Sequence, residues 1–392
     1  MQRTTVLCKL KHLALAASLC WMAAAHATDV TTESAPADGW AGASGSTSGG
    51  AAAVSSRIYL VSSPSQLLAA IRAAGSYPKI IKVAGTIDMT AADNGGPFTS
   101  ETDQNTRNRI TLKSNTTLIG LGHDATLLNA AVLIKKIDNV IVRNLNIVNP
   151  CDIAPVWDPT DGASGNWNSQ YDGIVIDQST HVWIDHNSFT DAPQTDDLAP
   201  IENGKLKQCH DGALDIKNAA DFVTVSYNVF DQHDKNNLVG SSDSTTTDDG
   251  HLRVTFHHNL FSRIVQRAPR VRFGMVHVYN NYYAGDTSDP VYGHEYSLGV
   301  GYMAKIISEN NAFDIVGVSS CAKIALNPGS YSRPGAITDA GSLLNGAPLA
   351  LATACALQAN VGWSVPYPYV LTPADAVKDA VQGAAGAGKL AL

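Results

Sequence analysis

Charged residues are scarce in this chain of 392 residues: they make up 16% of it, and the 35 acidic residues outnumber the 27 basic ones. The resulting net charge of −8 argues against a general nucleic-acid-binding protein, because such proteins are usually basic. Glycine and proline follow no collagen-like period. Hydrophobic residues nevertheless make up 44% of the chain, which is enough for a sizeable core and excludes a wholly disordered protein.

Long apolar runs are also missing, apart from one of 13 residues between Leu13 and Ala25. This run is too short to span a bilayer comfortably. The positive residues before it and the small residues in Ala25-His26-Ala27 are typical of a secretory signal peptide. We therefore predict a signal peptide over residues 1–27, a secreted protein, and a single mature domain over residues 28–392 with no membrane contact. A retained membrane anchor is the alternative.

Cysteine is rare, and cleavage after Ala27 would leave only Cys151, Cys209, Cys321 and Cys355. Because no CxxC spacing occurs, these residues do not indicate a metal site. An even number of cysteines in an exported chain indicates up to two disulfides. Three pairings are possible, and we favour the pairs nearest in sequence, Cys151–Cys209 and Cys321–Cys355.

Familiar catalytic motifs are absent too, since the sequence contains no GxSxG elbow, Walker loop or EF-hand loop. What it does contain is a repeat of the form apolar-x-apolar-x-x-Asn-x-aromatic. Four copies are clear: Val182–Phe189, Val223–Phe230, Val254–Phe261 and Val276–Tyr283. Two looser copies are Val140–Ile147, with Leu145 at the asparagine place, and Ile306–Phe313.

The spacing of the repeat predicts a parallel β-solenoid. The repeated asparagines are 41, 31, 22 and 30 residues apart, at Asn187, Asn228, Asn259, Asn281 and Asn311. A shortest interval of 22 residues fits one solenoid turn but not a four-stranded propeller blade. Longer intervals then place the extra residues in outward loops. We expect each repeated asparagine to adopt a left-handed turn conformation and to bond to the asparagines above and below it.

Two helices are predicted outside the repeat. The first begins at Pro64 after an N-cap at Ser63 and ends at Gly75, and a strand over Lys79–Val83 follows it. The second begins after Thr372-Pro373. A solenoid needs its open ends covered, and we expect both helices to contribute to this.

An acidic constellation is the first candidate site. Asp211 and Asp215 are four residues apart, so in a strand they share a face, and stacking would bring Asp172 of the preceding turn alongside. Three close carboxylates repel one another unless a cation lies between them. Oxygen ligands alone favour Ca²⁺ over Zn²⁺. The alternative is a set of solvated surface acids.

A basic constellation is the second candidate. Four arginines fall within ten residues that contain no acid: Arg263, Arg267, Arg270 and Arg272. Guanidinium groups bind carboxylates in pairs of hydrogen bonds, so a polyanion groove is one interpretation and a solvated basic loop is the other. Lys235, expected in a turn just after a repeat, would add a positive charge. His186, His257 and His258 occupy repeat positions and are interpreted as structural, because neighbouring strand residues face opposite sides.

Several ordered segments resemble the secreted pectate lyases of the polysaccharide lyase family 1 type. They are Asp38–Ala41, Val182–His186, Asp211–Ile216, Gly240–Asp243, Arg267–Gly274 and Ala385–Leu390. The Gly-, Ser- and Ala-rich residues 31–55, which would otherwise be interpreted as a flexible linker, resemble the family's N-terminal segment. The resemblance implies an all-β fold, a right-handed single-stranded parallel β-helix with outward loops and short capping helices.

The resemblance also implies roles for individual residues. Asp172, Asp211 and Asp215 take the places of the calcium ligands, Arg267 that of the catalytic base, and Lys235 and Arg272 those of the substrate-binding residues. One departure is Gln170, where some members carry a further aspartate. The acidic cluster favours unesterified substrate, because related pectin lyases lack it.

The implied activity is calcium-dependent β-elimination of polygalacturonate by a monomer that binds neither nucleic acid nor membrane. Neighbouring cations would favour the neutral form of the guanidine base, since like charges disfavour the charged form, so we expect an alkaline optimum. The alternatives are a β-helical pectin lyase on methyl-esterified chains, a galacturonan hydrolase with two carboxylates across the scissile bond, and a non-catalytic polysaccharide-binding β-helix.

Overall fold

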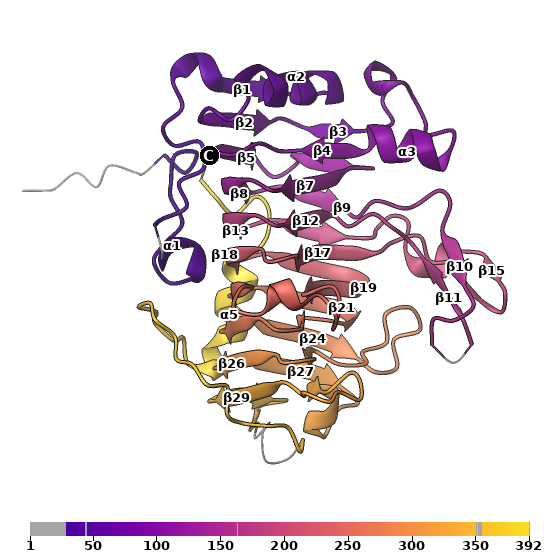
Figure 1. The fold of residues 1–392 in the computed structure, drawn as a ribbon, viewed down its shortest axis with the longest axis vertical. Helices are drawn as coiled ribbons and strands as arrows, with labels where there is room; N and C mark the ends of the chain where they lie inside the picture. The colour runs from indigo at the N-terminus through magenta and orange to yellow at the C-terminus, as the bar shows by residue number, and fades with distance from the viewer. Residues whose placement is uncertain (1–28, 44, 163, 350, 352–354, 392) are drawn as a thin grey trace, which may run out of the picture.

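A computed structural model describes residues 29–43, 45–162, 164–349, 351 and 355–391. The predicted signal peptide lies outside these residues. The described chain winds into a stack of parallel strands, seen from the side in Figure 1. Its most regular sheet consists of the strands that begin each sequence repeat and their neighbours, listed here in stacking order: β1 (Ile58–Val61), β2 (Lys79–Val83), β5 (Thr116–Gly120), β8 (Asp138–Arg143), β13 (Thr180–Asp185), β18 (Asp221–Ser226), β20 (Arg253–His257), β23 (Met275–Tyr279), β26 (Lys305–Glu309) and β29 (Ala336–Ala340).

The remaining parallel strands form two further faces of the stack. One face follows the asparagine of each repeat and consists of β3 (Thr86–Asp88), β6 (Thr126–Leu128), β9 (Asn146–Val148), β14 (Ser188–Thr190), β21 (Leu260–Gln266), β24 (Tyr282–Asp286), β27 (Ala312–Val316) and β30 (Leu343–Leu344). The other consists of β4 (Arg109–Thr111), β7 (Ala131–Lys135), β12 (Ile174–Asp177), β17 (Gly212–Lys217), β22 (Arg270–Val271), β25 (Leu298–Val300) and β28 (Ala325–Leu326).

One long strand, β19 (Val229–Val239), belongs to both of these faces. Its first half pairs with β14 and β21, and its second half pairs with β17 and β22. The parallel β-helix predicted from the repeat is therefore confirmed.

Short hairpins, one short strand and several helices lie outside the parallel sheets. Two hairpins project from it, β10 (Val156–Asp158) with β11 (Asn166–Asn168) and β15 (Ile201–Glu202) with β16 (Lys205–Leu206), on the right of Figure 1. The short strand β31 (Ala347–Pro348) pairs antiparallel with β30. The described α-helices with given bounds are α1 (Trp40–Ala43), α2 (Pro64–Ala74), α3 (Glu101–Arg107) and α5 (Ala374–Ala384). Within the described residues, no helix is both long and apolar enough to cross a membrane.

An asparagine ladder holds successive turns together. The side-chain amide of Asn187 donates to Asn228, Asn228 to Asn259, Asn259 to Asn281 and Asn281 to Asn311, over 2.9–3.1 Å. The predicted bonding is confirmed, but the predicted left-handed conformation is wrong for these residues. The residue before each of them has the positive φ instead: His186, Tyr227, His258, Asn280 and Asn310. The turn is made one position earlier, which leaves the asparagine amide pointing along the stack.

The aromatic position of the repeat also forms a buried stack. Phe189, Phe230, Phe261, Tyr283 and Phe313 succeed one another with ring centroids 4.3–5.2 Å apart. Their burial, together with that of the alternating Val and Ile residues of the regular sheet, forms one continuous core along the stack. Ring stacking adds specific geometry to this burial.

Both predicted helices are present, but they pack against different parts of the β-helix. Leu67 and Ile71 of α2 are buried in the core above the first strands, so α2 covers the open end at the top of Figure 1. Val377 and Val381 of α5 pack instead against Tyr282 and Ala312 on the outer flank. The expectation that α5 closes an end is therefore wrong, because its apolar stripe matches the outward side chains of β24 and β27.

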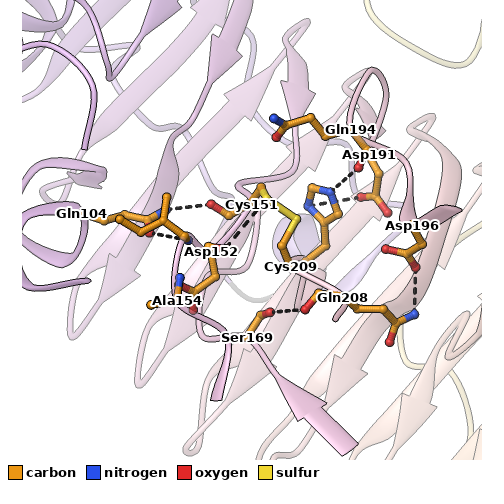
Figure 2. Close-up of a disulfide and its surroundings, with 12 residues drawn as sticks. Gln104, Cys151, Asp152, Ala154, Ser169, Asp191, Gln194, Asp196, Gln208 and Cys209 are labelled. Atoms are coloured by element: carbon orange, nitrogen blue, oxygen red, sulfur yellow. Dashed lines mark hydrogen bonds and ion pairs between the residues drawn. A yellow bond between two sulfur atoms is a disulfide. The ribbon is translucent and has the colours of Figure 1, made fainter. Parts of the chain in front are cut away.

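The segment after residue 28 is packed rather than linker-like. The backbone amides of Trp40 and Ala41 donate to the side-chain hydroxyls of Thr255 and Thr224. Small residues are required here, because a Cβ on Gly50 would lie 1.9 Å from the carbonyl oxygen of Lys79. This explains the Gly-rich composition without flexibility. Both favoured disulfides, Cys151–Cys209 (Figure 2) and Cys321–Cys355, are present.

Candidate active site

Three carboxylates meet on the face that contains β12 and β17. Asp172 and Asp211 lie just before β12 and β17, and Asp215 lies within β17, next to Val175 of β12 in register. Asp172 and Asp215 are only 3% and 6% exposed, whereas Asp211 is half-buried. A Cβ on Gly212 would lie 2.7 Å from Oδ1 of Asp172 and 2.6 Å from Oδ1 of Asp215. Glycine at this position therefore lets the two carboxylates approach each other.

The environment of these carboxylates favours neutralisation of their charge. Burial, followed by the charges of Asp215 and Asp211, raises the pKa of Asp172 well above its ordinary value. Burial also raises the pKa of Asp215, with a further contribution from Asp211. Asp172 accepts a hydrogen bond from the Gly212 amide over 2.8 Å. Oδ1 of Asp215, by contrast, is buried and has no hydrogen-bond donor among the described residues.

Lys217 is a member of this cluster that the sequence analysis missed. Its Nζ lies 3.5 Å from Oδ2 of Asp172 and 3.6 Å from Oδ2 of Asp215. Burial alone would lower the pKa of Lys217, but the charges of the aspartates outweigh it and raise this pKa to about 12. A usable signal was present in the sequence. Asp215 and Lys217 are two residues apart in one strand and therefore share a face.

Lys235 lies beside the acidic cluster, although not in the element expected. It is within β19 rather than in a turn, because this strand continues from one face of the stack to the next. In register it pairs with Gly212, the neighbour of Asp211. Its Nζ lies 3.8 Å from Oδ1 of Asp211, and its side chain is 12% exposed. The structure thus brings Lys235 and the three aspartates together.

Arg267 follows directly in the next turn of the stack. Lys235 pairs with Gln266, and Arg267 comes immediately after it with a positive φ of 63°. Burial raises the pKa of Asp215, and the charge of Arg267 offsets a small part of this rise, so the two groups act on each other electrostatically. Among the described residues, the buried Nε of Arg267 has no hydrogen-bond partner. Nε is thus one donor of this guanidine group that the described residues leave unsatisfied.

The other arginines of the basic segment have partners. Nε of Arg272 donates to Asp243 over 2.7 Å, and its terminal amino group donates to the carbonyl oxygen of Gly240. Burial, followed by the charge of Arg270, lowers the pKa of Arg272. Arg270 donates to the hydroxyl of Tyr331 over 3.3 Å, although its Nε, like that of Arg267, is buried without a hydrogen-bond partner among the described residues. Arg263 forms an exposed ion pair with Asp231 and is thereby occupied.

A calcium ion fits the donor chemistry of the acidic cluster. Within the described parts of the chain, no group of three or more His, Cys, Asp or Glu side chains is arranged as a ready metal cage. The orphaned oxygen of Asp215 and the close approach permitted by Gly212 nevertheless leave acceptors that the protein itself does not satisfy. Carboxylate oxygens without nitrogen or sulfur ligands suit Ca²⁺. Asp172, Asp211 and Asp215 are the residues that would hold it.

The histidines of the repeat are structural, as predicted. His257 stacks on Tyr279 and His258 stacks on Tyr227, at centroid distances of 4.9 and 4.8 Å. Burial lowers the pKa of both histidines, that of His258 to about 4. Both rings therefore remain neutral and serve packing along the stack.

The fold and the cluster of acidic and basic side chains define a β-helical enzyme of the polysaccharide lyase class. The sequence model of the family described as "Pectate lyase" matches residues 10–390, and the chain belongs to this family. It is 41% identical to a pectate lyase of Bacillus subtilis, over 90% of this chain and 92% of the relative. It is 42% identical to pectate lyase E of Dickeya dadantii, over 94% of this chain and 90% of the relative.

Solved structures show the same similarity. A Bacillus subtilis pectate lyase mutant superimposes with a TM-score of 0.88 at 39% identity, covering 93% of this chain and 100% of the other. A pectate lyase bound to a hexasaccharide superimposes with a TM-score of 0.87 at 38% identity, with the same coverage. The family match and these superpositions together establish the β-helix and the enzyme class.

Proposed function

We propose that this protein cleaves α-1,4-polygalacturonate by calcium-dependent β-elimination, with Arg267 as the base and 4,5-unsaturated oligogalacturonides as products. One observation carries the proposal: the guanidine of Arg267, whose Nε has no hydrogen-bond partner among the described residues, lies one turn from Lys235 and interacts electrostatically with Asp215 of the acidic cluster. The hexasaccharide bound to a structural relative supports an extended sugar ligand.

In the proposed reaction, neutral Arg267 removes the proton from C5 of a galacturonate unit. The electrons of the C–H bond form the C4=C5 double bond, and the glycosidic oxygen leaves C4 with its bonding pair and takes a proton from water. Asp172, Asp211 and Asp215 would hold the calcium ion, which when bound would supply a Lewis acid for the substrate carboxylate. Lys235 stabilises the negative charge that develops on this carboxylate.

Arg272 is proposed to bind a further substrate carboxylate. In the structure its partner is Asp243, whose side chain is 45% exposed. Ion pairs that face water contribute little stability, so a substrate carboxylate can replace Asp243 at low cost. Asp243 thereby holds Arg272 in a binding geometry until substrate arrives.

The proposal is tested with polygalacturonate as substrate, by following the ultraviolet absorbance of the unsaturated product with and without a calcium chelator. Arg267→Ala is expected to lower kcat by about a thousandfold, the usual order for loss of a general base, while the variant still binds calcium. Arg263→Ala is the matched control, because Arg263 belongs to the same segment but is paired with Asp231. We expect an alkaline optimum for the unmodified enzyme.

Other outcomes would identify the alternatives. Saturated products would indicate a hydrolase, and a preference for fully esterified chains would indicate a pectin lyase. Binding of polygalacturonate without any product would indicate a non-catalytic β-helix. Full activity in the presence of the chelator, or an acidic optimum, would contradict the proposed mechanism.

We also propose that the protein is secreted after cleavage behind Ala27. The two disulfides support this, because such bonds persist in oxidising compartments. Mass spectrometry of the exported protein should give an N-terminus at residue 28, and a chain that retains residues 1–27 would contradict the prediction.

A further inference from the structure

The turn that carries Arg267 lies between β21 and β22 and is tied to the turns of the stack on both sides. The amide of Asn237 donates to the carbonyl oxygen of Arg267 over 2.6 Å. The amide of Ala268 donates to the carbonyl oxygen of Ser297 over 2.7 Å. Arg267 itself has a positive φ of 63°, a conformation that L-residues adopt only at a cost in energy. The backbone at this position therefore depends on the contacts around it.

One of these contacts comes from a side chain in the core. The hydroxyl of Tyr283 donates to the carbonyl oxygen of Ala268 over 3.0 Å, and the tyrosine is only 1% exposed. The carbonyl oxygens of Arg267 and Pro269, on either side of Ala268, accept from backbone amides instead. No backbone amide of the described residues donates to the Ala268 carbonyl. Tyr283 thus satisfies the carbonyl that directly follows Arg267.

Tyr283 is also the only member of the buried aromatic stack that has a hydroxyl. The other four members are phenylalanines, and Tyr283 stacks between two of them, Phe261 and Phe313. A phenylalanine would fill the same space, so packing alone does not require the hydroxyl. A hydroxyl inside an apolar core is costly unless it forms a hydrogen bond. The polar member of the stack therefore coincides with the turn that carries Arg267.

The hydroxyl remains a donor under alkaline conditions. Burial raises the pKa of Tyr283 well above its ordinary value, so the proton stays on the oxygen. Without this proton donor, the Ala268 carbonyl would be left in the core unsatisfied, which is more costly than the loss of an exposed hydrogen bond. Rotation of the peptide toward another donor would relieve this cost, and it would displace Arg267 because the two residues are adjacent.

We propose that Tyr283 is a positioning residue for Arg267. Its hydroxyl holds the Ala268 carbonyl, and thereby the backbone from which the guanidine reaches the substrate. The inference rests on the proposed function, because it takes Arg267 to be the base. Tyr283 lies in the core and acts only through the backbone, whereas Lys235 and Arg272 act on the substrate directly.

The test is Tyr283→Phe, assayed on polygalacturonate. We expect kcat to fall at least about tenfold, since a displacement of about 1 Å can cost up to about a hundredfold. KM should stay within about twofold of the unmodified value, because Lys235 and Arg272 keep their contacts. Tyr282→Phe is the matched control: this neighbouring tyrosine of β24 also loses a hydroxyl, one that donates to Asp314 over 3.1 Å, and its kcat should be unchanged.

Two further variants separate positioning from stability. Phe189→Leu lowers stability within the same aromatic stack, but two rings separate Phe189 from Tyr283, so kcat measured below the unfolding temperature should be unchanged. Tyr283→Phe in the Arg267→Ala background should cause no further loss of the residual rate, because the hydroxyl acts only through Arg267.

Equal kcat values for Tyr283→Phe and Tyr282→Phe would overturn the positioning role. A loss in Phe189→Leu as large as that in Tyr283→Phe would overturn it too, as would a further loss in the Arg267→Ala background. In each case the inactivity of Arg267→Ala would still support the proposed base. Full activity of Arg267→Ala would contradict that base and the inference with it, so the two failures are distinguishable.

Discussion

At the scale of single residues, Lys217 places an ammonium group against two carboxylates proposed as calcium ligands. Its distances of 3.5 and 3.6 Å to Asp172 and Asp215 make it their counter-ion when no metal is bound. We therefore predict that Lys217→Met binds calcium at least about fivefold more tightly, since a positive charge at this range repels the cation. The same variant should be less stable without calcium. Titration calorimetry and thermal unfolding measure the two effects.

Lys135→Met is the control for this prediction. Lys135 pairs with Asp177 over 2.9 Å, and its side chain is 51% exposed, so its removal changes the charge near the cluster without touching Asp172 or Asp215. Equal calcium affinities for Lys217→Met and the unmodified protein would show that Lys217 does not compete with the ion.

His233 makes stability depend on pH. Burial alone would lower its pKa, but the charge and hydrogen bond of Asp191, with smaller contributions from Asp196 and Asp234, raise it to about 9. Because this folded-state value exceeds the ordinary 6.5, the stabilisation is complete below pH 6.5 and declines above it. It is lost once the pH has risen through about 9. The free energy of unfolding, measured by urea denaturation between pH 6 and 9.5, should therefore fall across this window.

His233→Gln should remove most of this fall and lower stability mainly at pH 6. His251→Gln is the control, because His251 also faces a carboxylate, that of Asp221, but its side chain is 47% exposed. A pH dependence in His233→Gln as steep as that of the unmodified protein would assign the effect to other groups.

At the scale of elements, the asparagine ladder is the device that joins one turn to the next. Asn259 is fully buried, its amide donates to Val225 and Asn281, and its side-chain oxygen accepts from the backbone and side chain of Asn228. Asn259→Ala leaves these partners unsatisfied and should lower the free energy of unfolding by about 3 kcal/mol. Chemical denaturation measures this, with the exposed Asn360→Ala as the control. A loss below about 1 kcal/mol would show that the ladder is not needed for stability.

The fold was largely predictable from the sequence because the ladder asparagine and the aromatic residue recur within a visible pattern. The positions of the positive φ angles were not, since residues as different as His186, Tyr227 and Asn280 adopt them. The place of α5 was not predictable either. The apolar stripe of α5 predicts that this helix packs against another apolar surface. It does not predict that the surface is the outer flank around Tyr282.

For the site, side-chain alternation along a strand and the stacking of turns predicted that Asp172, Asp211 and Asp215 lie close together. The same alternation rule, applied to Lys217, would have placed it on the face of Asp215. The unsatisfied Nε of Arg267 could not be predicted. Whether an arginine is paired depends on partners distant in sequence, as Asp231 for Arg263 and Asp243 for Arg272 show. The roles of these residues remain predictions that the assays above will test.

At the scale of the whole molecule, the two disulfides differ in what they fix. Cys151–Cys209 joins residues 58 apart beside the acidic cluster, and Cys321–Cys355 joins residues 34 apart near the far end of the stack. Replacing either pair by serine should lower the free energy of unfolding by about 4 kcal/mol, since each closes a long loop. Only the first replacement should also weaken calcium binding, because Cys209 is two residues from Asp211.

The second pair is thus the internal control for the first. Thermal unfolding reports the shared effect on stability, and calorimetric titration with calcium reports the local one. Equal calcium affinities for the two double variants would mean that the position of Asp211 is set by the strand alone.

The intervals between ladder asparagines range from 22 to 41 residues, yet each interval ends in the same amide contact. The length of the loop in a turn therefore does not affect the distance between that turn and the next. Loops that shape ligand preference can be exchanged, shortened or grafted between relatives while the turns above and below keep their positions. Specificity and foldability are separate, modular properties of this chain, and the loop between Asp191 and Asp211 is the natural first segment to redesign.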